Sequence, residues 1–468
     1  MKVAFHTLGC KVNQYETEAM KEAFASRGSI IVGEDEAADV YIVNTCTVTN
    51  IADRKSRQYI RRMKGVNPEA YVVVTGCYAQ VESDEVAALP EVDLVVGNSN
   101  KSKICDAVYT ALKGETVDTA GFIKPRNELT DFEDMGLVVS SESGMTRAYI
   151  KIQEGCDRFC AYCLIPFARG PVRSRPLEQI LEEARMLLAA GYKELVLTGI
   201  NTALYGQEEG FLFNVRDEEG KILPGCEEFA TMTEEERQAL APIEVVLARL
   251  NALEGDFRIR LSSLEPTVVD KNDVERIIKY DKLCHHLHLS AQSGSSDVLK
   301  LMNRRYTKEE YLDIVKAIHD YDPLYNITTD IIVGFSGETD ENFADSLDVT
   351  RQCEFGKVHV FRYSVRKGTV GEKLPDAIPA TVKADRAATL SRIAGEVAHQ
   401  FNQKNLGKTH RVLIEEMVTV ENNEYLTGYT GNYIRVYIPV DSAAEPGTFV
   451  NATLIEHMED GCLARLCN

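Results

Sequence analysis

Three cysteines lie close together near the start of the middle third of the chain. Cys156, Cys160 and Cys163 have the spacing C-x3-C-x2-C, in a predicted loop that follows a strand. Three thiolates at this spacing can share one metal centre. Structural zinc requires four ligands, whereas a cubane iron–sulfur cluster that is held by three thiolates keeps one iron free of protein ligands. That free iron could bind and activate a small molecule, so the pattern indicates an iron–sulfur centre that performs chemistry.

Part of this motif has a simpler interpretation. Cys160 and Cys163 alone form a C-x2-C pair, which could serve as a redox dithiol or as half of a zinc site. Phe159 and Tyr162 occupy the positions before these two cysteines, where aromatic side chains could shield a cluster. A motif match is a hypothesis until its structural context is known, so the rest of the chain must decide between these interpretations.

Three further cysteines follow strands that are predicted within residues 1–120. Short apolar runs separated by helical periodicity predict an open parallel sheet covered on both faces, with strands over 3–8, 40–44, 71–75 and 93–96 and helices over 14–27 and 51–64. Cys10, Cys46 and Cys77 come just after the first three strands. Because the carboxyl ends of parallel strands share one edge of a sheet, we expect these thiols to form a second three-thiolate site. The alternative is three unrelated small residues of the core.

Residues 146–378 repeat the alternation of strand and helix. The predicted strands cover 148–153, 194–198, 258–262, 286–290, 327–333 and 357–363. Six such units indicate an α/β fold with an incomplete parallel (β/α)6 barrel, in which chemistry lies at the C-terminal ends of the strands. The C-x3-C-x2-C loop follows the first strand, as this rule requires. His285, His286 and His288 are interpreted as strand residues that support the barrel, because a catalytic histidine needs a suitable geometry.

The remaining segments complete the predicted domain organisation. Residues 121–145 are rich in acidic residues, Ser and Gly and are predicted to be a linker. Residues 206–241 contain ten acidic and three basic residues and are interpreted as an exposed insertion in the barrel, with Cys226 as a free thiol. A connecting helix is expected over 379–407, and short strands over 408–468 predict a small antiparallel β-barrel.

Composition limits the classes of function. The length of 468 residues suggests about three domains. No apolar run reaches the roughly 20 residues of a membrane helix, and the N-terminal residues lack a signal-peptide pattern, so we expect a cytoplasmic protein with no membrane partner. Twelve cysteines then favour metal ligation over disulfides.

A net charge of −20 argues against nucleic-acid binding, although basic residues gather locally: Arg54, Lys55, Arg57, Arg61, Arg62 and Lys64; Arg169, Arg173 and Arg175; Arg304 and Arg305; Arg362, Arg366 and Lys367.

Four short segments carry a family resemblance. They read LGCKVNQYE (8–16), NTCTV (44–48), TGCYA (75–79) and EGCDRFCAYCLIPFARGPVRSRP (154–176). Together they resemble the radical S-adenosylmethionine methylthiotransferases, and KVNQYE is most similar to the bacterial branch that acts on N6-threonylcarbamoyladenosine in tRNA. The C-terminal segment resembles the TRAM module, an RNA-binding relative of the oligonucleotide-binding barrel, in which Tyr429, Tyr433, Tyr437 and Arg435 are expected to face RNA.

This resemblance implies two [4Fe-4S] clusters and S-adenosylmethionine as cofactors. Cys156, Cys160 and Cys163 would hold the cluster that cleaves S-adenosylmethionine, while Cys10, Cys46 and Cys77 would hold the cluster that carries the sulfur to be inserted. No catalytic residue beyond these ligands is expected. A second S-adenosylmethionine would supply the methyl group, and the product would carry a methylthio group at C2 of the adenine.

The resemblance also assigns S-adenosylmethionine to the strand ends of the barrel. The expected contacts are Gly199, Asn201, Glu265, Gln292 and Gly334. Gly199 would allow a close backbone approach, and Glu265 could accept hydrogen bonds from ribose hydroxyls, although each residue could also serve only as part of a turn. The expected partners are the anticodon loop of tRNA, an external reductant such as flavodoxin or ferredoxin, and a sulfur source.

Three other functions remain open from the sequence. The same chemistry could act on isopentenyl-adenosine or on a ribosomal protein aspartate, although LGCKVNQYE argues against both. A radical enzyme of another reaction type is disfavoured by the N-terminal cysteines. A non-catalytic zinc protein that binds RNA would contain zinc and no sulfide.

Overall fold

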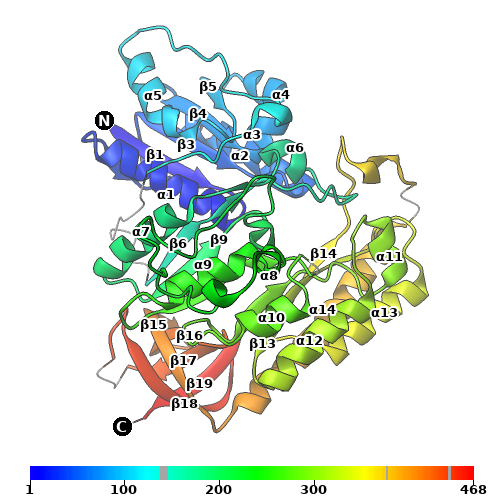
Figure 1. Ribbon diagram of the computed structural model, residues 1–468. Coiled ribbons are helices and arrows are strands. Elements are labelled where there is room, and N and C mark those ends of the chain that lie inside the picture. The colour runs from blue at the N-terminus through cyan, green and yellow to red at the C-terminus, as the bar shows by residue number, and fades with distance from the viewer. Residues whose placement is uncertain (137–145, 267, 376–377, 441–443, 468) are drawn as a thin grey trace. The chain divides into compact units, whose positions relative to one another are not determined.

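The computed structural model describes residues 1–136, 146–266, 268–375, 378–440 and 444–467, and the chain divides into two compact units (Figure 1). The first unit comprises Met1–Ser140, Gln153–Arg175 and Ser364–Glu372. The second comprises Ser141–Ile152, Pro176–Tyr363 and Lys373–Asn468. The first unit therefore joins the N-terminal sheet to the C-x3-C-x2-C segment, which is distant in sequence.

The first unit is built on a five-stranded parallel sheet in the order β2-β1-β3-β4-β5. The strands are β1 (Lys2–Thr7), β2 (Ile30–Val32), β3 (Val40–Thr45), β4 (Tyr71–Gly76) and β5 (Leu94–Val96). The helices are α1 (Lys11–Ala25), α2 (Asn50–Val66), α3 (Cys77–Val81), α4 (Ser83–Ala87) and α5 (Ile104–Leu112). The predicted parallel sheet is confirmed, and β2 and α5 were not among the predicted elements.

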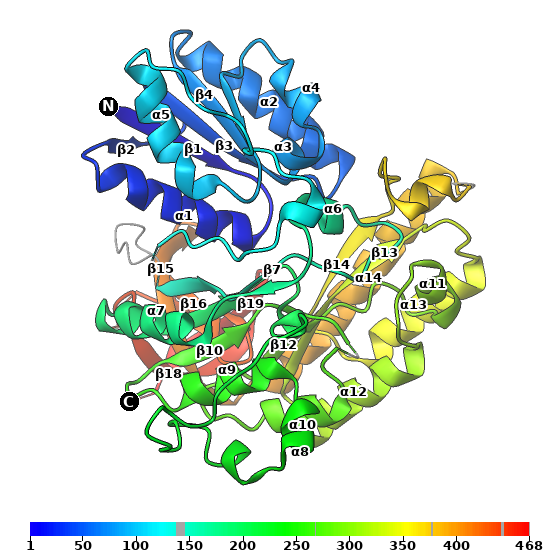
Figure 2. The ribbon, with the colours of Figure 1, turned by 45° about the horizontal axis from the view of Figure 1, so that its top comes forward.

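Helices cover both faces of this sheet (Figure 2). Side chains of α1 and α5, such as Phe24 and Val108, pack with Val73 on one face. Side chains of α2 and α4, such as Ile60, pack with Val74 on the other face. Successive residues of β4 thus point into opposite cores, which explains why its sequence is a continuous apolar run rather than an alternating one.

The segment after the sheet also packs on the first unit. Phe122 is buried in the core beside α5, and its carbonyl accepts a hydrogen bond from the amide of Gly97 at 2.8 Å. Farther along, the carbonyl of the buried Leu129 accepts a hydrogen bond from Arg173 at 2.7 Å. Residues 137–145 of the predicted linker lie outside the described residues.

The described part of the second unit contains seven parallel strand segments, with the order β6-β9-β10 in one sheet and β11-β12-β13-β14 in the next. Their bounds are β6 (Arg147–Lys151), β9 (Glu194–Thr198), β10 (Arg258–Leu261), β11 (Ser263–Leu264), β12 (His286–Leu289), β13 (Asn326–Val333) and β14 (Lys357–Arg362). Only Ser262 separates β10 from β11, so the two form one bent strand. This is the open parallel barrel that the sequence predicts.

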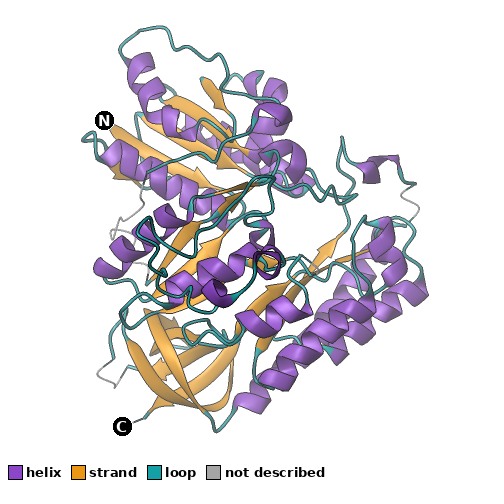
Figure 3. Cartoon of the chain, viewed as in Figure 1, coloured by secondary structure: helices purple, strands orange, loops and turns teal. Residues whose placement is uncertain are grey.

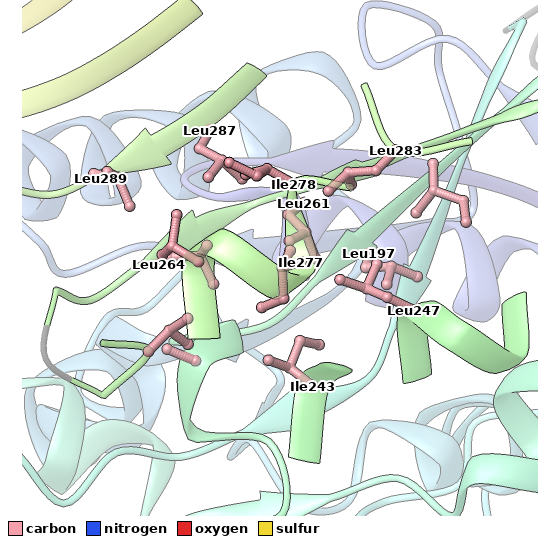
Figure 4. Packing of buried hydrophobic residues seen from close by; sticks show 14 of the residues in the cluster. Leu197, Ile243, Leu247, Leu261, Leu264, Ile277, Ile278, Leu283, Leu287 and Leu289 are labelled. Carbon is pink, nitrogen blue, oxygen red and sulfur yellow. The ribbon is translucent and has the colours of Figure 1, made fainter. Parts of the chain in front are cut away.

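Helices supply the outer layer of the barrel. They are α7 (Leu177–Ala189), α9 (Pro242–Asn251), α10 (Lys271–Ile277), α11 (Ser296–Leu301), α12 (Lys308–Tyr321), α13 (Asp340–Gln352) and α14 (Ala380–Asn405). Figure 4 shows Ile243 and Leu247 of α9 and Ile277 of α10 packed with Leu197 and Leu261 of the strands. All five side chains are buried, so this core holds the strand ends in a fixed frame.

Part of the acidic insertion folds as a small satellite of the barrel. Cys226 and Phe229 are buried with Val245 and Ala248 of α9, and a short helix, α8 (Glu234–Gln238), follows. The helix α8 itself is exposed and begins with a capping box of Thr233 and Glu236. Cys226 is thus a core thiol of this satellite.

The C-terminal residues close into a five-stranded barrel, drawn as a ring of arrows in Figure 3. The strands are β15 (Thr409–Val420), β16 (Asn423–Thr430), β17 (Arg435–Pro439), β18 (Phe449–Met458) and β19 (Gly461–Leu466). All neighbours pair antiparallel except β17 and β19, which are parallel. Phe401 from α14 completes the barrel core. No described helix is both long and apolar enough to cross a membrane.

Candidate functional site

The register of the N-terminal sheet brings three cysteines to one edge. Thr7 of β1 is level with Asn44 of β3, and Asn44 is level with Thr75 of β4. Cys10, Cys46 and Cys77 follow these positions within three residues, and we call them the N-terminal triad. Their three loops therefore leave the sheet side by side, as the sequence predicts from parallel pairing.

Two glycines make room for the N-terminal triad. Gly9 has φ of +103°, and a Cβ added there would lie 2.9 Å from the Sγ of Cys46. Gly76 has φ of +98°, and its Cβ would lie 2.4 Å from the carbonyl oxygen of Thr45. Both backbone conformations favour glycine. The sharp turn at Gly76 ends β4 and makes Cys77 the first residue of α3.

The thiols of the N-terminal triad influence one another electrostatically. Burial, with smaller contributions from the neighbouring Cys77 and Cys10, raises the pKa of Cys46 to about 12. The Cys46 thiol is therefore neutral unless a metal binds and deprotonates it. Within the described chain no three His, Cys, Asp or Glu side chains are placed to hold a single metal ion. A cubane does not need such convergence, because each thiolate binds a different iron, so the donor set fits an iron–sulfur cluster.

The second group of thiols, which we call the radical triad, is Cys156, Cys160 and Cys163. It lies between β7 (Gln153–Glu154) and α6 (Ile165–Arg169). The amide of Cys163 donates to the carbonyl of Cys160 at 2.9 Å, and the amide of Ile165 donates to the Sγ of Cys163 at 3.4 Å. Amide donors to sulfur stabilise a thiolate and influence the potential of a bound cluster. Three thiols on one tight loop fit the three-ligand cluster predicted for this motif.

The loop of the radical triad contains one residue in a strained conformation. Phe159 has φ of +48°, which non-glycine residues rarely adopt. Its ring packs edge-on to Phe167 at 5.8 Å between centroids, and the guanidinium of Arg126 lies 4.9 Å from the ring centre. These contacts hold the strained backbone turn between Cys156 and Cys160. They also place aromatic surface beside the loop, consistent with the shielding role predicted for Phe159.

A buried network of charged side chains lies beside the N-terminal triad. Arg169, Glu16, Glu154 and Lys101 are all at most 1% exposed. The Nη1 of Arg169 contacts Oε1 of Glu16 at 2.5 Å and Oε1 of Glu154 at 2.6 Å, and Lys101 pairs with the other oxygen of Glu16. The Nε of Arg169 donates to the Sγ of Cys77 at 3.3 Å.

This network corrects one expectation from the sequence. Arg169, Arg173 and Arg175 look like a basic surface patch in the sequence, but they are 0%, 5% and 3% exposed. They are internal cations of the first unit and do not offer a surface to RNA. The sequence signal that could have indicated this was Glu154, a carboxylate within reach of the same loop.

A second buried arginine supports the loop of Cys46. The Nη2 of Arg366 donates to Thr47 Oγ1 at 2.6 Å and to Asp53 Oδ2 at 2.7 Å, and Nη1 donates to Asn50. Arg366 is 4% exposed and comes from the segment that follows the last barrel strand. In the sequence Arg366 looks like part of a basic patch, but the structure shows it as a buried support of the triad loop.

The predicted cofactor contacts lie at strand ends of the second unit. Gly199 and Asn201 follow β9, Glu265 follows β11, Gln292 follows β12 and Gly334 follows β13. The Nδ2 of Asn201 donates to Oε2 of Glu265 at 2.6 Å. These two residues follow different strands, and their side chains meet at the C-terminal ends of the strands, as the barrel fold predicts.

Further contacts fix the orientation of these residues. Arg304 lies 3.3 Å from the second oxygen of Glu265, which is 5% exposed. The amide of Gly334 donates to Glu338 at 2.6 Å, and Glu338 pairs with Arg386 at 3.0 Å. Burial raises the pKa of Glu338 even though Arg386 opposes that shift. The loop after β13 is therefore rigidly held.

Gln292 and the three histidines have mainly structural contacts. Gln292 has φ of +62°, and its backbone amide donates to the carbonyl oxygen of Asp330 at 2.8 Å. The rings of His286 and His288 contact Thr328 at 3.0 Å and 2.9 Å, and His285 contacts Asp322 at 2.6 Å. These contacts tie β12 to β13 and the residues around it, in agreement with the supporting role predicted for the histidines.

The tyrosines expected to face RNA have other partners in the second unit. Tyr433 stacks on Tyr429 at 4.7 Å, and the guanidinium of Arg260 lies 4.3 Å from the Tyr433 ring centre. Tyr437 is 3% exposed and donates to Asp460 at 2.7 Å. Arg260 comes from β10, so Tyr429 and Tyr433 attach the C-terminal barrel to the parallel barrel. The buried Tyr437 therefore does not offer its ring to RNA, whereas Tyr429 and Tyr433 are partly exposed and their contact with RNA stays a prediction.

The first unit does offer an exposed basic surface. In the described chain, Arg54, Lys55 and Arg61 on α2 are exposed and have no ion-pair partner. Arg62 on the same helix pairs with Asp35. Because α2 begins four residues after Cys46, this basic surface continues from a loop of the N-terminal triad.

Comparisons with known proteins agree with this architecture. Residues 2–97 match the model of the uncharacterized protein family UPF0004, and residues 150–349 match the radical SAM superfamily. A solved structure of the radical S-adenosylmethionine methyltransferase TsrM from Kitasatospora setae, with cobalamin and a [4Fe-4S] cluster bound, has a TM-score of 0.51 at 14% identity. That comparison covers 77% of this chain and 74% of TsrM, and at this identity it shows the fold alone.

Curated relatives cover nearly the whole chain. Threonylcarbamoyladenosine tRNA methylthiotransferase MtaB of Aquifex aeolicus (strain VF5) is 38% identical over 93% of this chain and 96% of its own length. The protein of the same name from Bacillus subtilis (strain 168) is also 38% identical, over 93% and 89%. A tRNA-2-methylthio-N(6)-dimethylallyladenosine synthase of Pelotomaculum thermopropionicum is 32% identical over 87% and 85%.

These relatives decide between the interpretations that the cysteines alone left open. A redox dithiol or a non-catalytic zinc protein does not account for identity that spans both cysteine triads and the parallel barrel. Radical SAM proteins use a [4Fe-4S] cluster and S-adenosylmethionine, and the donor set of the radical triad fits that cluster. The chain therefore belongs to the radical S-adenosylmethionine tRNA methylthiotransferases and is an enzyme of the MtaB type.

Proposed function

We propose that this enzyme transfers a methylthio group to C2 of N6-threonylcarbamoyladenosine at position 37 of tRNA. The observation that carries the proposal is the presence of two three-cysteine groups in one compact unit, on loops that share hydrogen bonds. A single triad would suffice for radical chemistry alone. A second triad supports insertion of sulfur as well, and the similarity to the MtaB relatives supports the choice of substrate.

In this proposal each triad holds one [4Fe-4S] cluster. When bound, the clusters and two S-adenosylmethionine molecules supply reductive radical generation, the sulfur atom and the methyl group. The protein contributes placement and exclusion of solvent. Cys46 and Cys77 are buried, whereas Cys10 is exposed, so the N-terminal triad is open toward solvent at Cys10. That opening would admit a sulfur source or a substrate.

The strand ends of the barrel are proposed to bind S-adenosylmethionine. Glu265 can accept hydrogen bonds from ribose hydroxyls, because Asn201 and Arg304 hold its two oxygens in a fixed orientation. Gly199 would allow close approach of the ligand to the backbone. Gly334 packs against the side chain of Lys383 and would contribute through its backbone, and Gln292 lies at the neighbouring strand end. These assignments rest on family resemblance together with the position of the residues at the strand ends.

The proposed nucleic-acid partner is the anticodon loop of tRNA. The C2 atom of an adenine in a single-stranded loop becomes accessible when the base is splayed out into a pocket. The exposed residues Arg54, Lys55 and Arg61 on α2 supply the positive charge for contacts with phosphates. An external reductant such as flavodoxin or ferredoxin and a separate sulfur source complete the reaction, which we place in the cytoplasm.

A second substrate deserves direct comparison because other relatives are named as dimethylallyladenosine enzymes. We propose to incubate the reconstituted enzyme with two tRNAs, one carrying N6-threonylcarbamoyladenosine and the other carrying dimethylallyladenosine. Mass spectrometry of the nucleosides should show methylthiolation of the first and not of the second. Methylthiolation of dimethylallyladenosine alone would refute the proposed substrate, and nucleosides from a deletion strain would test it in the cell.

A further inference from the structure

Arg169 and its neighbour Gly170 connect the two groups of cysteines. Its Nε donates to the Sγ of Cys77 at 3.3 Å, so it touches a member of the N-terminal triad directly. The next residue, Gly170, accepts a hydrogen bond from the amide of Cys156 at 3.0 Å, so it binds the first member of the radical triad. Two consecutive residues thus contact both triads.

The orientation of Arg169 is set by buried carboxylates. Glu16 contacts both terminal nitrogens, at 2.5 Å and 3.1 Å, while Glu154 contacts Nη1 at 2.6 Å. Asn13 also accepts a hydrogen bond from Nη2. With both ends of the guanidinium occupied in this way, the remaining donor, Nε–H, points at Cys77. A lysine could not reproduce this planar arrangement of donors.

The four charges at the centre of the network balance one another, and the buried Arg173 adds a further cation 3.9 Å from Oε2 of Glu154. Glu16 and Glu154 carry negative charges, and Lys101 and Arg169 carry positive charges, with no more than 1% exposure each. A buried ion is costly unless it is paired, so the network keeps Arg169 charged beside the sulfur. Glu16 lies in α1, and Glu154 lies just before the radical triad. The network therefore joins segments that are distant in the sequence.

We propose that Arg169 is a positioning residue for the N-terminal cluster that also raises its reduction potential. This inference rests on the proposed function, since it requires a cluster on Cys10, Cys46 and Cys77. A hydrogen bond to a ligating sulfur and a nearby positive charge both stabilise the more negative, reduced state of an iron–sulfur cluster. The hydrogen bond from the amide of Cys156 to the carbonyl of Gly170 holds the loop of the radical triad in a fixed position relative to Arg169 and Cys77.

The test uses protein in which only the N-terminal cluster can form. Cys156, Cys160 and Cys163 are replaced by Ala in the full chain, and the protein is reconstituted with iron and sulfide. In this parent we compare Arg169→Lys, Glu154→Gln and the double variant Arg169→Gln/Glu154→Gln. The double variant removes one positive and one negative charge, so the buried network remains balanced. Arg260→Gln removes a buried, ion-paired arginine from the second unit and serves as the control.

The measurements are iron content, circular dichroism and an electron-paramagnetic-resonance redox titration. We expect the double variant and Arg169→Lys to have a more negative midpoint potential, or to lose cluster iron while remaining folded. The midpoint potential of Glu154→Gln should not be more negative than that of the parent, because this substitution removes a negative charge and leaves the hydrogen bond from Arg169 to Cys77 in place. Arg260→Gln should keep the potential of the parent.

The experiment distinguishes failure of the proposed function from failure of the role proposed for Arg169. A parent that binds no iron would refute the N-terminal cluster and with it the proposed function. A parent that binds about four irons, by analogy with one cubane, with an unchanged potential and iron content in both Arg169 variants, would overturn the role of Arg169 alone. If both Arg169 variants unfold while Arg260→Gln stays folded, Arg169 serves folding rather than the cluster, and the inference also fails.

Discussion

Replacement of Gly76 by Ala should damage the N-terminal triad selectively. Gly76 ends β4 and precedes Cys77, and it has φ of +98° and ψ of −168°. A Cβ at this position would lie 2.4 Å from the carbonyl oxygen of Thr45, 2.6 Å from its amide nitrogen and 2.7 Å from Asn44 Oδ1. The first two atoms belong to the backbone of β3, which is fully buried and cannot move aside cheaply.

The expected cost can be worked out from two contributions. The backbone conformation of Gly76 is essentially restricted to glycine, and for alanine it costs about 1–3 kcal/mol. Overpacking against a rigid neighbour adds about 1–3 kcal/mol. The total of about 2–6 kcal/mol is comparable to the stability of a whole domain, which is about 5–15 kcal/mol. We therefore expect local loss of structure around Cys46 and Cys77 in Gly76→Ala.

The control is Gly114→Ala in the same unit. Gly114 also has a positive φ, +78°, but no atom lies within 4 Å of its added Cβ. Gly114→Ala should therefore be destabilised only by its unfavourable backbone conformation, by about 1–2 kcal/mol. Hydrogen–deuterium exchange of residues 71–81 should accelerate in Gly76→Ala and not in Gly114→Ala, and reconstituted iron should fall toward half. Equal exchange and equal iron content in the two variants would refute the reasoning from the Cβ contacts.

Three other predictions test the roles of the two triads, the RNA surface and the barrel. A variant with Ala at all three positions of the N-terminal triad should still form 5′-deoxyadenosine with dithionite but no methylthiolated tRNA; methylthiolated product would show that this triad is only structural. Replacement of Arg54, Lys55 and Arg61 by Glu should weaken tRNA binding and lower its salt dependence; an unchanged slope in a binding titration at several salt concentrations would place the RNA elsewhere. Although burial opposes it, Arg260 and Arg258 hold the pKa of Glu194 well below its usual value of 4.5, so its contribution to stability is complete above about pH 4.5 and is lost as the pH falls further. Acid unfolding of Glu194→Gln should therefore depend less steeply on pH below about 4.5, and equal slopes would contradict this assignment.

Regular features of the fold were predictable because they depend on local sequence. The apolar runs of β1, β3 and β4 indicate parallel strands, and parallel pairing alone requires their C-terminal ends to share an edge. The loops carrying Cys10, Cys46 and Cys77 could therefore be placed without any knowledge of side-chain contacts. The same argument located Asn201 and Glu265 at neighbouring strand ends of the barrel.

Features that depend on pairing between distant residues were not predictable. Arg169 and Glu16 are separated by 153 positions, and Arg366 and Asp53 by 313. In the sequence each arginine appears as part of a basic cluster. Glu154 is a nearby signal for Arg169, but nothing local indicates that Glu16 or Asp53 will be buried against these arginines. The same difficulty applies to Tyr433, whose partner Arg260 lies on a barrel strand.

The composition of the first unit explains why these distant pairs matter. Helices α1 and α2 beside the N-terminal sheet carry the buried carboxylates of Glu16 and Asp53, and among the described residues 1–136 Lys101 is the internal cation paired with Glu16. Arg169 comes from the loop of the radical triad and Arg366 from the segment after the last barrel strand. A sheet fragment without those two segments would keep a buried carboxylate at position 53 without its arginine, which is unfavourable. Correct assembly of the N-terminal triad therefore depends on the same segment that carries the radical triad, and this dependence ties the sulfur-bearing loops to the loop that starts the radical reaction.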